Sequence, residues 1–99
     1  MVRTNYERGT EVERKIEEHF KNKGYHAQRS AGSHSLVDVF VWNNQEIFFI
    51  QSKRCKSKIG SSIYKDLEKF KNLECPPYVQ KEFWVWVDYK GFTILWKSY

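Results

Sequence analysis

Two runs of β-branched and aromatic residues near the middle of the sequence constrain the fold more than any other feature. They span residues 36–42 and 46–53, and Asn43-Asn44 lies between them. β-Branched and aromatic side chains favour strands and asparagine favours tight turns, so the two runs predict a β-hairpin. Most positions of both runs are apolar, which indicates strands that are buried on both faces. Such a sheet needs other elements to cover it.

The first covering element is a helix in the N-terminal part of the chain. Its apolar stripe consists of Val12, Ile16 and Phe20. This spacing is that of one helix face, and Gly24 predicts that the helix ends near residue 23. At the start of the helix, either Thr4 with Glu7 or Thr10 with Glu13 forms a capping box.

The rest of the chain predicts one more helix and three more strands. The apolar stripe of the second helix consists of Ile63, Leu67 and Phe70. Residues 25–30 predict a short strand, residues 83–88 and 92–96 predict a closing hairpin, and the second helix ends before Pro76-Pro77. No repeat or linker interrupts the chain, so we expect one domain over residues 1–99. The expected fold is α/β in the order α-β-β-β-α-β-β, with one mixed sheet and two covering helices.

The positive charge of the chain is concentrated in its central part. The formal net charge is +5, and residues 19–60 carry the whole excess, because their lysines and arginines face only two acids, Asp38 and Glu46. A basic centre with isolated carboxylates is expected when a protein binds a polyanion and also holds a metal ion. An ordinary solvated surface would have the same composition.

An acid, an amide and a lysine in the central runs form the clearest chemical pattern. Asp38 lies in the first run, and Gln51 and Lys53 end the second. Because strand side chains alternate, Gln51 and Lys53 share a face while Ser52 points away, and Asp38 can lie beside them. A carboxylate in an apolar strand needs a partner, which is either a divalent cation or Lys53. Glu46 falls on the opposite face from Gln51 unless a bulge intervenes.

The first helix offers one further carboxylate. At about 100° per residue, Glu13 lies roughly 60° from the centre of the apolar stripe. Glu17 lies about 100° from that centre, and Glu11 and Glu18 lie farther away. Glu13 therefore faces inward most, either as a cap with Thr10 or as a functional group.

Five short motifs between residues 8 and 60 form a set that is more specific than any one of them. In chain order they are Arg8-Gly9-Thr10-Glu11-Val12-Glu13-Arg14-Lys15, Gly24-Tyr25, Arg29-Ser30-Ala31-Gly32-Ser33, Val37-Asp38-Val39 and Ile50-Gln51-Ser52-Lys53. The set resembles the archaeal Holliday-junction resolvases, which belong to the PD-(D/E)xK nucleases. This resemblance implies the restriction-endonuclease-like fold, a mixed central sheet flanked by helices.

The resemblance also implies a role for each polar residue of the pattern. Glu13 corresponds to the glutamate of the first helix, Asp38 to the metal-binding aspartate, and Lys53 to the lysine that positions or activates the attacking water. Gln51 stands where the resolvase pattern has a second acidic ligand. An amide oxygen can coordinate Mg²⁺ but adds no negative charge, so we expect weaker cation binding. A Gln-x-Lys version also occurs in other branches of the superfamily.

These assignments predict a metal-dependent endonuclease that hydrolyses phosphodiester bonds in structured DNA, with resolution of the Holliday (four-way) junction as the first choice of reaction. Asp38, Gln51 and Glu13 would hold Mg²⁺, for which Mn²⁺ is a possible substitute, and Lys53 would orient the water. The residues expected to contact DNA are Arg29, Ser30, Gly32, Ser33, Arg54, Lys56 and Lys58. Two other functions stay open: a restriction- or repair-type nuclease with another DNA substrate, and a nonenzymatic nucleic-acid-binding protein with a degenerate site.

The aromatic C-terminal part has three possible explanations. The residues concerned are Trp84, Trp86, Phe92 and Trp96. They belong to the core, to a homodimer interface, or to a surface that stacks on bases. The resemblance implies a homodimer, because two active sites related by twofold symmetry would cut two strands of a junction.

The remaining signals concern location and reactive side chains. No apolar run approaches the roughly 18 residues of a membrane span and the N-terminus lacks the apolar core of a signal peptide, so we expect an intracellular, cytoplasmic protein without membrane contact. Cys55 and Cys75 lack metal-ligand spacing, and we expect free thiols. His19, His26 and His34 are expected at the surface or in loops.

Overall fold

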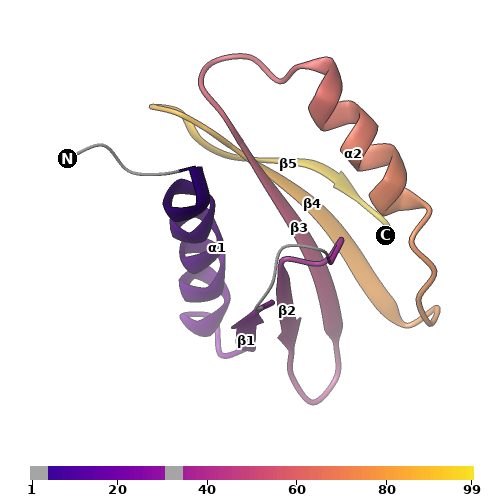
Figure 1. The fold of residues 1–99 in the computed structure, drawn as a ribbon. Coiled ribbons are helices and arrows are strands. Elements are labelled where there is room, and N and C mark those ends of the chain that lie inside the picture. Colours follow the sequence, from indigo (N-terminus) through magenta and orange to yellow (C-terminus); the bar gives the residue numbers. More distant parts are fainter. Residues whose placement is uncertain (1–4, 31–34) are drawn as a thin grey trace.

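A five-stranded sheet with two helices makes up the described part of the protein, residues 5–30 and 35–99 of a computed structural model (Figure 1). The elements are α1 (Asn5–Lys21), β1 (His26–Arg29), β2 (Val39–Trp42), β3 (Ile47–Cys55), α2 (Ser61–Lys71), β4 (Val79–Val87) and β5 (Gly91–Lys97). The expected order α-β-β-β-α-β-β is confirmed. Neither of these helices is long and apolar enough to cross a membrane.

The strands lie in the sheet in the order in which they occur in the chain. All neighbours are antiparallel except β3 and β4, which are parallel and are connected by α2. The predicted turn between β2 and β3 is present, and the Asn43 side chain accepts hydrogen bonds from the backbone N–H groups of Gln45 (2.8 Å) and Glu46 (2.7 Å). A parallel pair needs a long crossover connection, which here is α2.

Each helix covers one face of the sheet, and each face has its own apolar core. On the α1 face, the stripe Val12, Ile16 and Phe20 packs against residues of β1, β2 and β3 and against Trp84. On the α2 face, Ile63, Leu67 and Phe70 pack against alternate residues of β4, among them Phe83 and Val85. Both apolar stripes are therefore buried as their spacing predicted.

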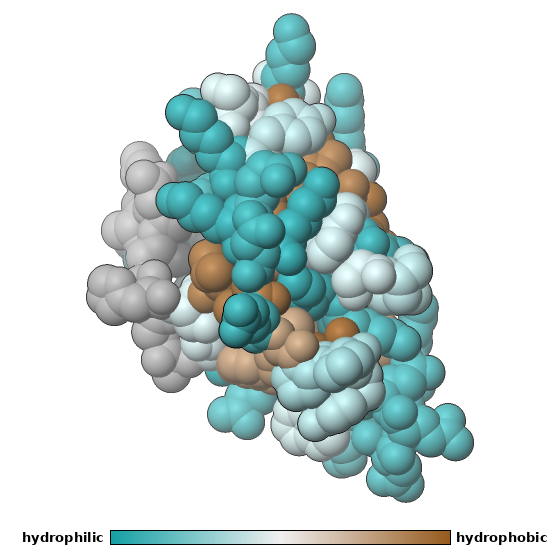
Figure 2. Space-filling model, turned by 90° about the vertical axis from the view of Figure 1, so that its right-hand side faces the viewer, coloured by the Kyte–Doolittle hydropathy of each residue, from teal (hydrophilic) through white to brown (hydrophobic). Residues whose placement is uncertain are grey.

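The C-terminal aromatic residues belong mainly to these two cores. Trp84 is only 4% exposed in the α1-face core, where Trp86 and Phe92 pack beside it. Trp96 packs against the α2-face core. Core packing, one of the three explanations offered above, thus accounts for all four residues. The side on which α2 lies is largely hydrophilic, with apolar areas interspersed between polar side chains (Figure 2).

The boundaries of β2 and β3 differ from those expected. The run of residues 36–42 begins as a strand only at Val39, because the backbone N–H of Asp38 donates to the carbonyl of Ile50 (2.9 Å), the residue with which Val39 pairs. This one-residue offset ends the regular ladder. At its other end, β3 continues past residue 53, where the predicted run ended, through Arg54 and Cys55, because they pair with β4.

The prediction that Thr10 and Glu13 form a capping box is wrong. The helix α1 already begins at Asn5, so both residues lie inside it. The other expected box includes Thr4, which lies outside the described residues.

A buried lysine closes the C-terminal end of α2. The Lys81 Nζ atom donates to the carbonyl oxygens of Phe70 (3.2 Å), Lys71 (2.8 Å) and Leu73 (2.9 Å), and the residue is 8% exposed. These carbonyls lie at or just beyond the C-terminal end of the helix, where a cation is favourable. Lys81 therefore fixes α2 to β4.

We expect the substitution Lys81→Met to lower the free energy of unfolding by about 2–4 kcal/mol, because it leaves buried carbonyl groups without a charged donor. Urea denaturation measures this change. Lys69→Met, at an exposed position of the same helix, is the control and should change the stability by less than about 0.5 kcal/mol. Equal stabilities of the two variants would contradict this role.

Candidate active site

Asp38 is held at the point where β2 begins, between β1 and β3. Its backbone N–H donates to Ile50, and its carbonyl accepts a hydrogen bond from the N–H of Ser30 at 2.8 Å. Its carboxylate atom Oδ2 accepts a hydrogen bond from the backbone N–H of Ser52 at 2.9 Å and lies 3.5 Å from the Ser52 hydroxyl. Asp38 thus contacts the residues on both sides of Gln51.

The surroundings of Asp38 disfavour its charged form. Burial raises the pKa of the Asp38 carboxyl, whereas the Ser52 N–H, the charge of Lys53 and the Ser52 hydroxyl lower it. The net shift is upward, so burial outweighs the favourable contacts. A carboxylate kept in such a place would be stabilised by a cation.

Gln51 is buried next to Asp38 and has an unused oxygen. The residue is 5% exposed, and its Oε1 atom has no hydrogen-bond partner among residues 5–30 and 35–99. A buried amide oxygen without a donor costs free energy unless a ligand satisfies it. The strand alternation places Gln51 on the α2 face together with Phe49 and Lys53.

Lys53 does not form an ion pair with Asp38, which was one of the two partners considered for that carboxylate. Its Nζ atom lies 3.1 Å from Oδ2 of Asp66 on α2, and both side chains are about one-third exposed (33% and 34%). The charge of Lys53 nevertheless acts on Asp38. Lys53 therefore lies between the carboxylate of the sheet and a carboxylate of the helix.

Glu13 reaches the site from α1, with Arg29 as its partner. The Arg29 Nε atom is 3.1 Å from Glu13 Oε1, and Arg29 Nη2 donates to the Thr10 hydroxyl at 3.3 Å. Burial raises the pKa of Glu13, the hydrogen bond from Arg29 lowers it, and the charge of Asp38 raises it further. The two carboxylates are thus close enough to influence each other.

The four residues of the expected constellation occupy one region of the molecule. Asp38, Gln51 and Lys53 are neighbours at the junction of β2 and β3, and Glu13 interacts electrostatically with Asp38. The unsatisfied oxygen of Gln51 and the disfavoured carboxylate of Asp38 fit a hard divalent cation, which prefers oxygen ligands. Within residues 5–30 and 35–99 no three His, Cys, Asp or Glu side chains gather as a metal site. The Gln51 amide oxygen is therefore a candidate ligand beside the carboxylates.

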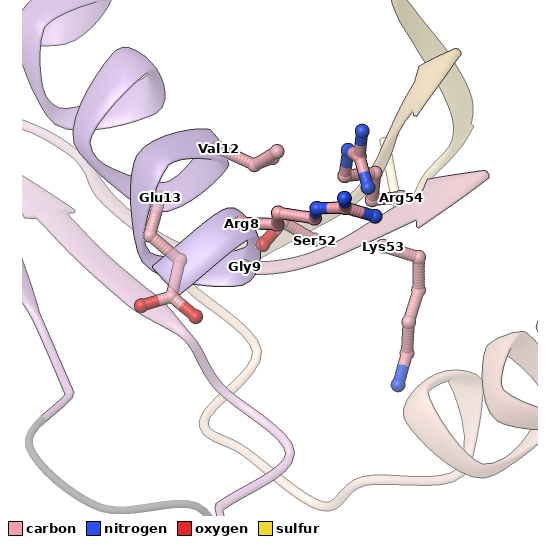
Figure 3. Close-up of a pocket in the computed structure, with 7 residues that line it drawn as sticks. All are labelled: Arg8, Gly9, Val12, Glu13, Ser52, Lys53 and Arg54. Atoms are coloured by element: carbon pink, nitrogen blue, oxygen red, sulfur yellow. The ribbon is translucent and has the colours of Figure 1, made fainter. Parts of the chain in front are cut away.

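A hollow of about 280 Å³ lies between α1 and β3 (Figure 3), and of the four residues Glu13 and Lys53 line it whereas Asp38 and Gln51 do not. Glu13 and Arg8 line it from α1, and Ser52, Lys53 and Arg54 line it from β3. In Figure 3 the Lys53 side chain extends toward α2, in agreement with its contact to Asp66. Solvent-exposed space therefore adjoins both the expected lysine and the expected helix glutamate.

The residues expected to contact DNA lie in several places. Arg29 is paired with Glu13, and Arg54 Nη2 is 2.8 Å from Asp88 Oδ2. Ser30 is half-buried, and Lys56 and Lys58 are exposed in the connection that leads to α2. Gly32 and Ser33 lie outside the described residues. The two cysteines are free thiols, as expected.

Sequence reasoning missed two residues of this region. Asp66 belongs to α2, and only the packing of α2 against the sheet brings it to Lys53. No pattern in the sequence predicts this ion pair. Ser52 was expected to point away, yet its backbone N–H is the main hydrogen-bond donor to Asp38. A backbone group carries no sequence signal.

Comparison with known proteins places this arrangement in a family context. The family model described as archaeal Holliday junction resolvase (Hjc) matches residues 4–75. Among solved structures, the Hjc Holliday junction resolvase of Archaeoglobus fulgidus is similar with a TM-score of 0.63 and 18% sequence identity, over 88% of this chain and 70% of that one. A comparison with curated proteins found no match.

The structural likeness agrees with the fold expected from the sequence motifs. The family match extends over most of the chain and includes the whole constellation from Glu13 to Lys53. The chain therefore belongs to the archaeal Holliday junction resolvase family.

Proposed function

We propose that this protein is a divalent-metal-dependent endonuclease that resolves four-way DNA junctions. The observation that carries the proposal is that the Asp38 carboxylate is held by the Ser52 N–H, next in the chain to Gln51, whose buried oxygen has no partner among the described residues, in a member of a resolvase family. A buried polar atom without a protein partner is expected where a ligand completes the site.

Asp38, Gln51 and Glu13 would hold Mg²⁺ or Mn²⁺. A bound cation supplies charge neutralisation at the scissile phosphate and lowers the pKa of a bound water. The Ser52 N–H fixes Oδ2 of Asp38 and leaves the other carboxylate oxygen for the cation. Because Glu13 is paired with Arg29, it acts directly only when that ion pair opens, and otherwise through a water.

Lys53 would orient the attacking water and stabilise negative charge on the phosphate. The residue lines the hollow, and the ion pair with Asp66 holds its ammonium group toward α2 and limits the positions that it can take. A lysine fixed next to a phosphodiester is a preorganised hydrogen-bond donor. It stabilises negative charge on the phosphate better than water, which must first reorient. Asp66 thus acts as a positioning residue for Lys53.

The substrate and the assembly follow from the same proposal. Arg29, Arg54, Lys56 and Lys58 would contact phosphates, which gives salt-dependent binding with little base specificity. A homodimer would bring two sites to the two strands that a resolvase must cut. Such an enzyme would act on cellular DNA in the cytoplasm.

The central test compares cleavage of a four-way junction, a linear duplex, a flap and a single strand, each with Mg²⁺, with Mn²⁺ and with a chelator. We expect paired cuts in the junction only when a metal ion is present. Preferred cleavage of another substrate would favour a restriction- or repair-type nuclease. Junction binding without cleavage in either metal would favour a nonenzymatic binding protein, and light scattering of the same samples reports whether the protein is a dimer.

We predict that Asp38→Asn reduces the junction cleavage rate by at least about 100-fold, the scale of single catalytic groups. The stability should stay equal or rise, because burial raises the pKa of Asp38 and the neutral amide can still accept the Ser52 hydrogen bond. Single-turnover kinetics and thermal denaturation measure the two effects. Glu68→Gln, at an exposed carboxylate of α2, is the control. Unchanged cleavage by Asp38→Asn would show that Asp38 does not act in catalysis.

We predict that Gln51→Glu lowers the Mg²⁺ concentration for half-maximal cleavage by about tenfold, because a carboxylate adds charge where the amide has none. Without metal the same variant should be less stable than the wild type, since a second buried carboxylate beside Asp38 repels the first. Magnesium titration and denaturation with a chelator test both points. Gln45→Glu, in the turn between β2 and β3, is the control. An identical magnesium dependence of Gln51→Glu and the wild type would show that residue 51 is not a ligand.

A further inference from the structure

The hollow beside the candidate site continues along α1 as a groove. A second hollow of about 380 Å³ shares Arg8, Val12 and Arg54 with the first. It extends past Lys15 and Trp86 to Tyr89 in the turn that connects β4 and β5. We call the two hollows together the α1 groove. One end of the α1 groove adjoins Lys53, and the other lies at the β4–β5 turn.

Arg8 contributes an unsatisfied donor to this groove. Its Nε atom is buried and has no hydrogen-bond partner within the described part of the chain. The side chain extends from the first turns of α1 along the hollow, and its guanidinium lies toward Arg54 (Figure 3). A guanidinium has five N–H donors and no acceptor, so an acceptor such as a phosphate oxygen would satisfy the unused donor.

Arg54 brings a second guanidinium to the same space. Its Nη2 atom is held by Asp88 at 2.8 Å, which fixes the side chain and leaves other donors of the guanidinium for a ligand. Arg8 and Arg54 line both hollows. Two cations that share one cavity repel each other, so an anion between them would lower the free energy.

The half of the α1 groove that is farther from Lys53 is also lined by basic and aromatic side chains. The Lys15 Nζ atom lies 5.2 Å from the centre of the Trp86 ring. Tyr89 is fully exposed and has a positive φ of 65°, an uncommon conformation for a residue other than glycine. Two carboxylates along the groove are paired with arginines, Glu13 with Arg29 and Asp88 with Arg54.

We propose that Arg8, together with Arg54, binds a backbone phosphate of the DNA strand outside the scissile position, so that the strand runs from the active site along the α1 groove toward Tyr89. The two non-bridging oxygens of a backbone phosphate form a bidentate acceptor that matches the planar guanidinium group. The inference rests on the proposed function and deepens it by assigning a strand path. Arg8 was not among the residues expected to contact DNA.

The variant Arg8→Met tests this role, because it keeps the apolar stem and removes the charged head. Junction binding is measured by fluorescence anisotropy over a range of salt concentrations. A chelator is present so that the junction is not cleaved. We expect affinity at about 0.1 M salt to fall roughly tenfold, and the slope of log K against log salt to decrease in magnitude by about 1. Thermal stability should stay equal or rise, because the lost Nε–H has no partner.

A second measurement locates the phosphate. Single phosphates of the junction are replaced in turn by neutral methylphosphonates, and binding is measured for the wild type and for Arg8→Met. We expect at least one position, away from the scissile phosphate, where replacement weakens the wild type but not the variant. Arg8→Lys should restore part of the affinity, and Lys69→Gln, at an exposed position of α2, should leave the methylphosphonate pattern of the wild type intact.

The outcomes separate this inference from the proposed function. If the wild type neither binds nor cleaves the junction, the proposed function fails. If the wild type binds and cleaves but Arg8→Met has the same affinity, salt slope and methylphosphonate pattern, Arg8 is no phosphate ligand and only this inference fails. A drop in affinity together with loss of thermal stability would show that Arg8 acts on the fold, which would also overturn it.

Discussion

The parallel pairing of β3 with β4 is the constraint on which the rest of the structure depends. These strands pair along their entire length, from Ile47 with Val79 to Cys55 with Val87. A parallel pair needs a crossover, and α2 supplies it while covering one face of the sheet. Lys81 of β4 fixes the C-terminal end of this crossover, because its ammonium group donates hydrogen bonds to three backbone carbonyl oxygens. The same packing brings Asp66 of α2 to Lys53 of β3.

The candidate site uses the end of a regular ladder. Asp38 departs from the register of β2 and β3 by one residue, and this frees the Ser52 N–H to donate to the Asp38 side chain. Polar groups in such a place are costly, as the raised pKa of Asp38 and the unsatisfied Gln51 oxygen show. The apolar cores on both faces of the sheet offset that cost, since they bury most of the aliphatic and aromatic residues around the site. Unfavourable local interactions of this kind are common at functional sites.

Ion pairs balance the charges around the site from both sides of the sheet. Arg29 compensates Glu13 at α1, Asp66 compensates Lys53 at α2, and Asp88 holds Arg54 at the end of β3. Only part of the cationic set expected to meet DNA is therefore free of carboxylate partners. The Gln51 amide fits this balance, because a third carboxylate at that position would need a further cation.

The sequence by itself determined the order of the elements and both apolar stripes, and it predicted that Asp38 lies beside the strand that carries Gln51 and Lys53. Periodicity carries this information, because a stripe such as Val12, Ile16 and Phe20 can only be buried on one helix face. Only the tertiary structure decided that Lys53 pairs with Asp66, that Ser52 donates to Asp38 and that Arg8 shares a groove with Arg54. Those contacts join residues distant in sequence or use backbone atoms, and neither leaves a local pattern in the chain. The start of β2 and the end of β3 were likewise decided by pairing with neighbouring strands, because hydrogen bonds between strands override local propensity.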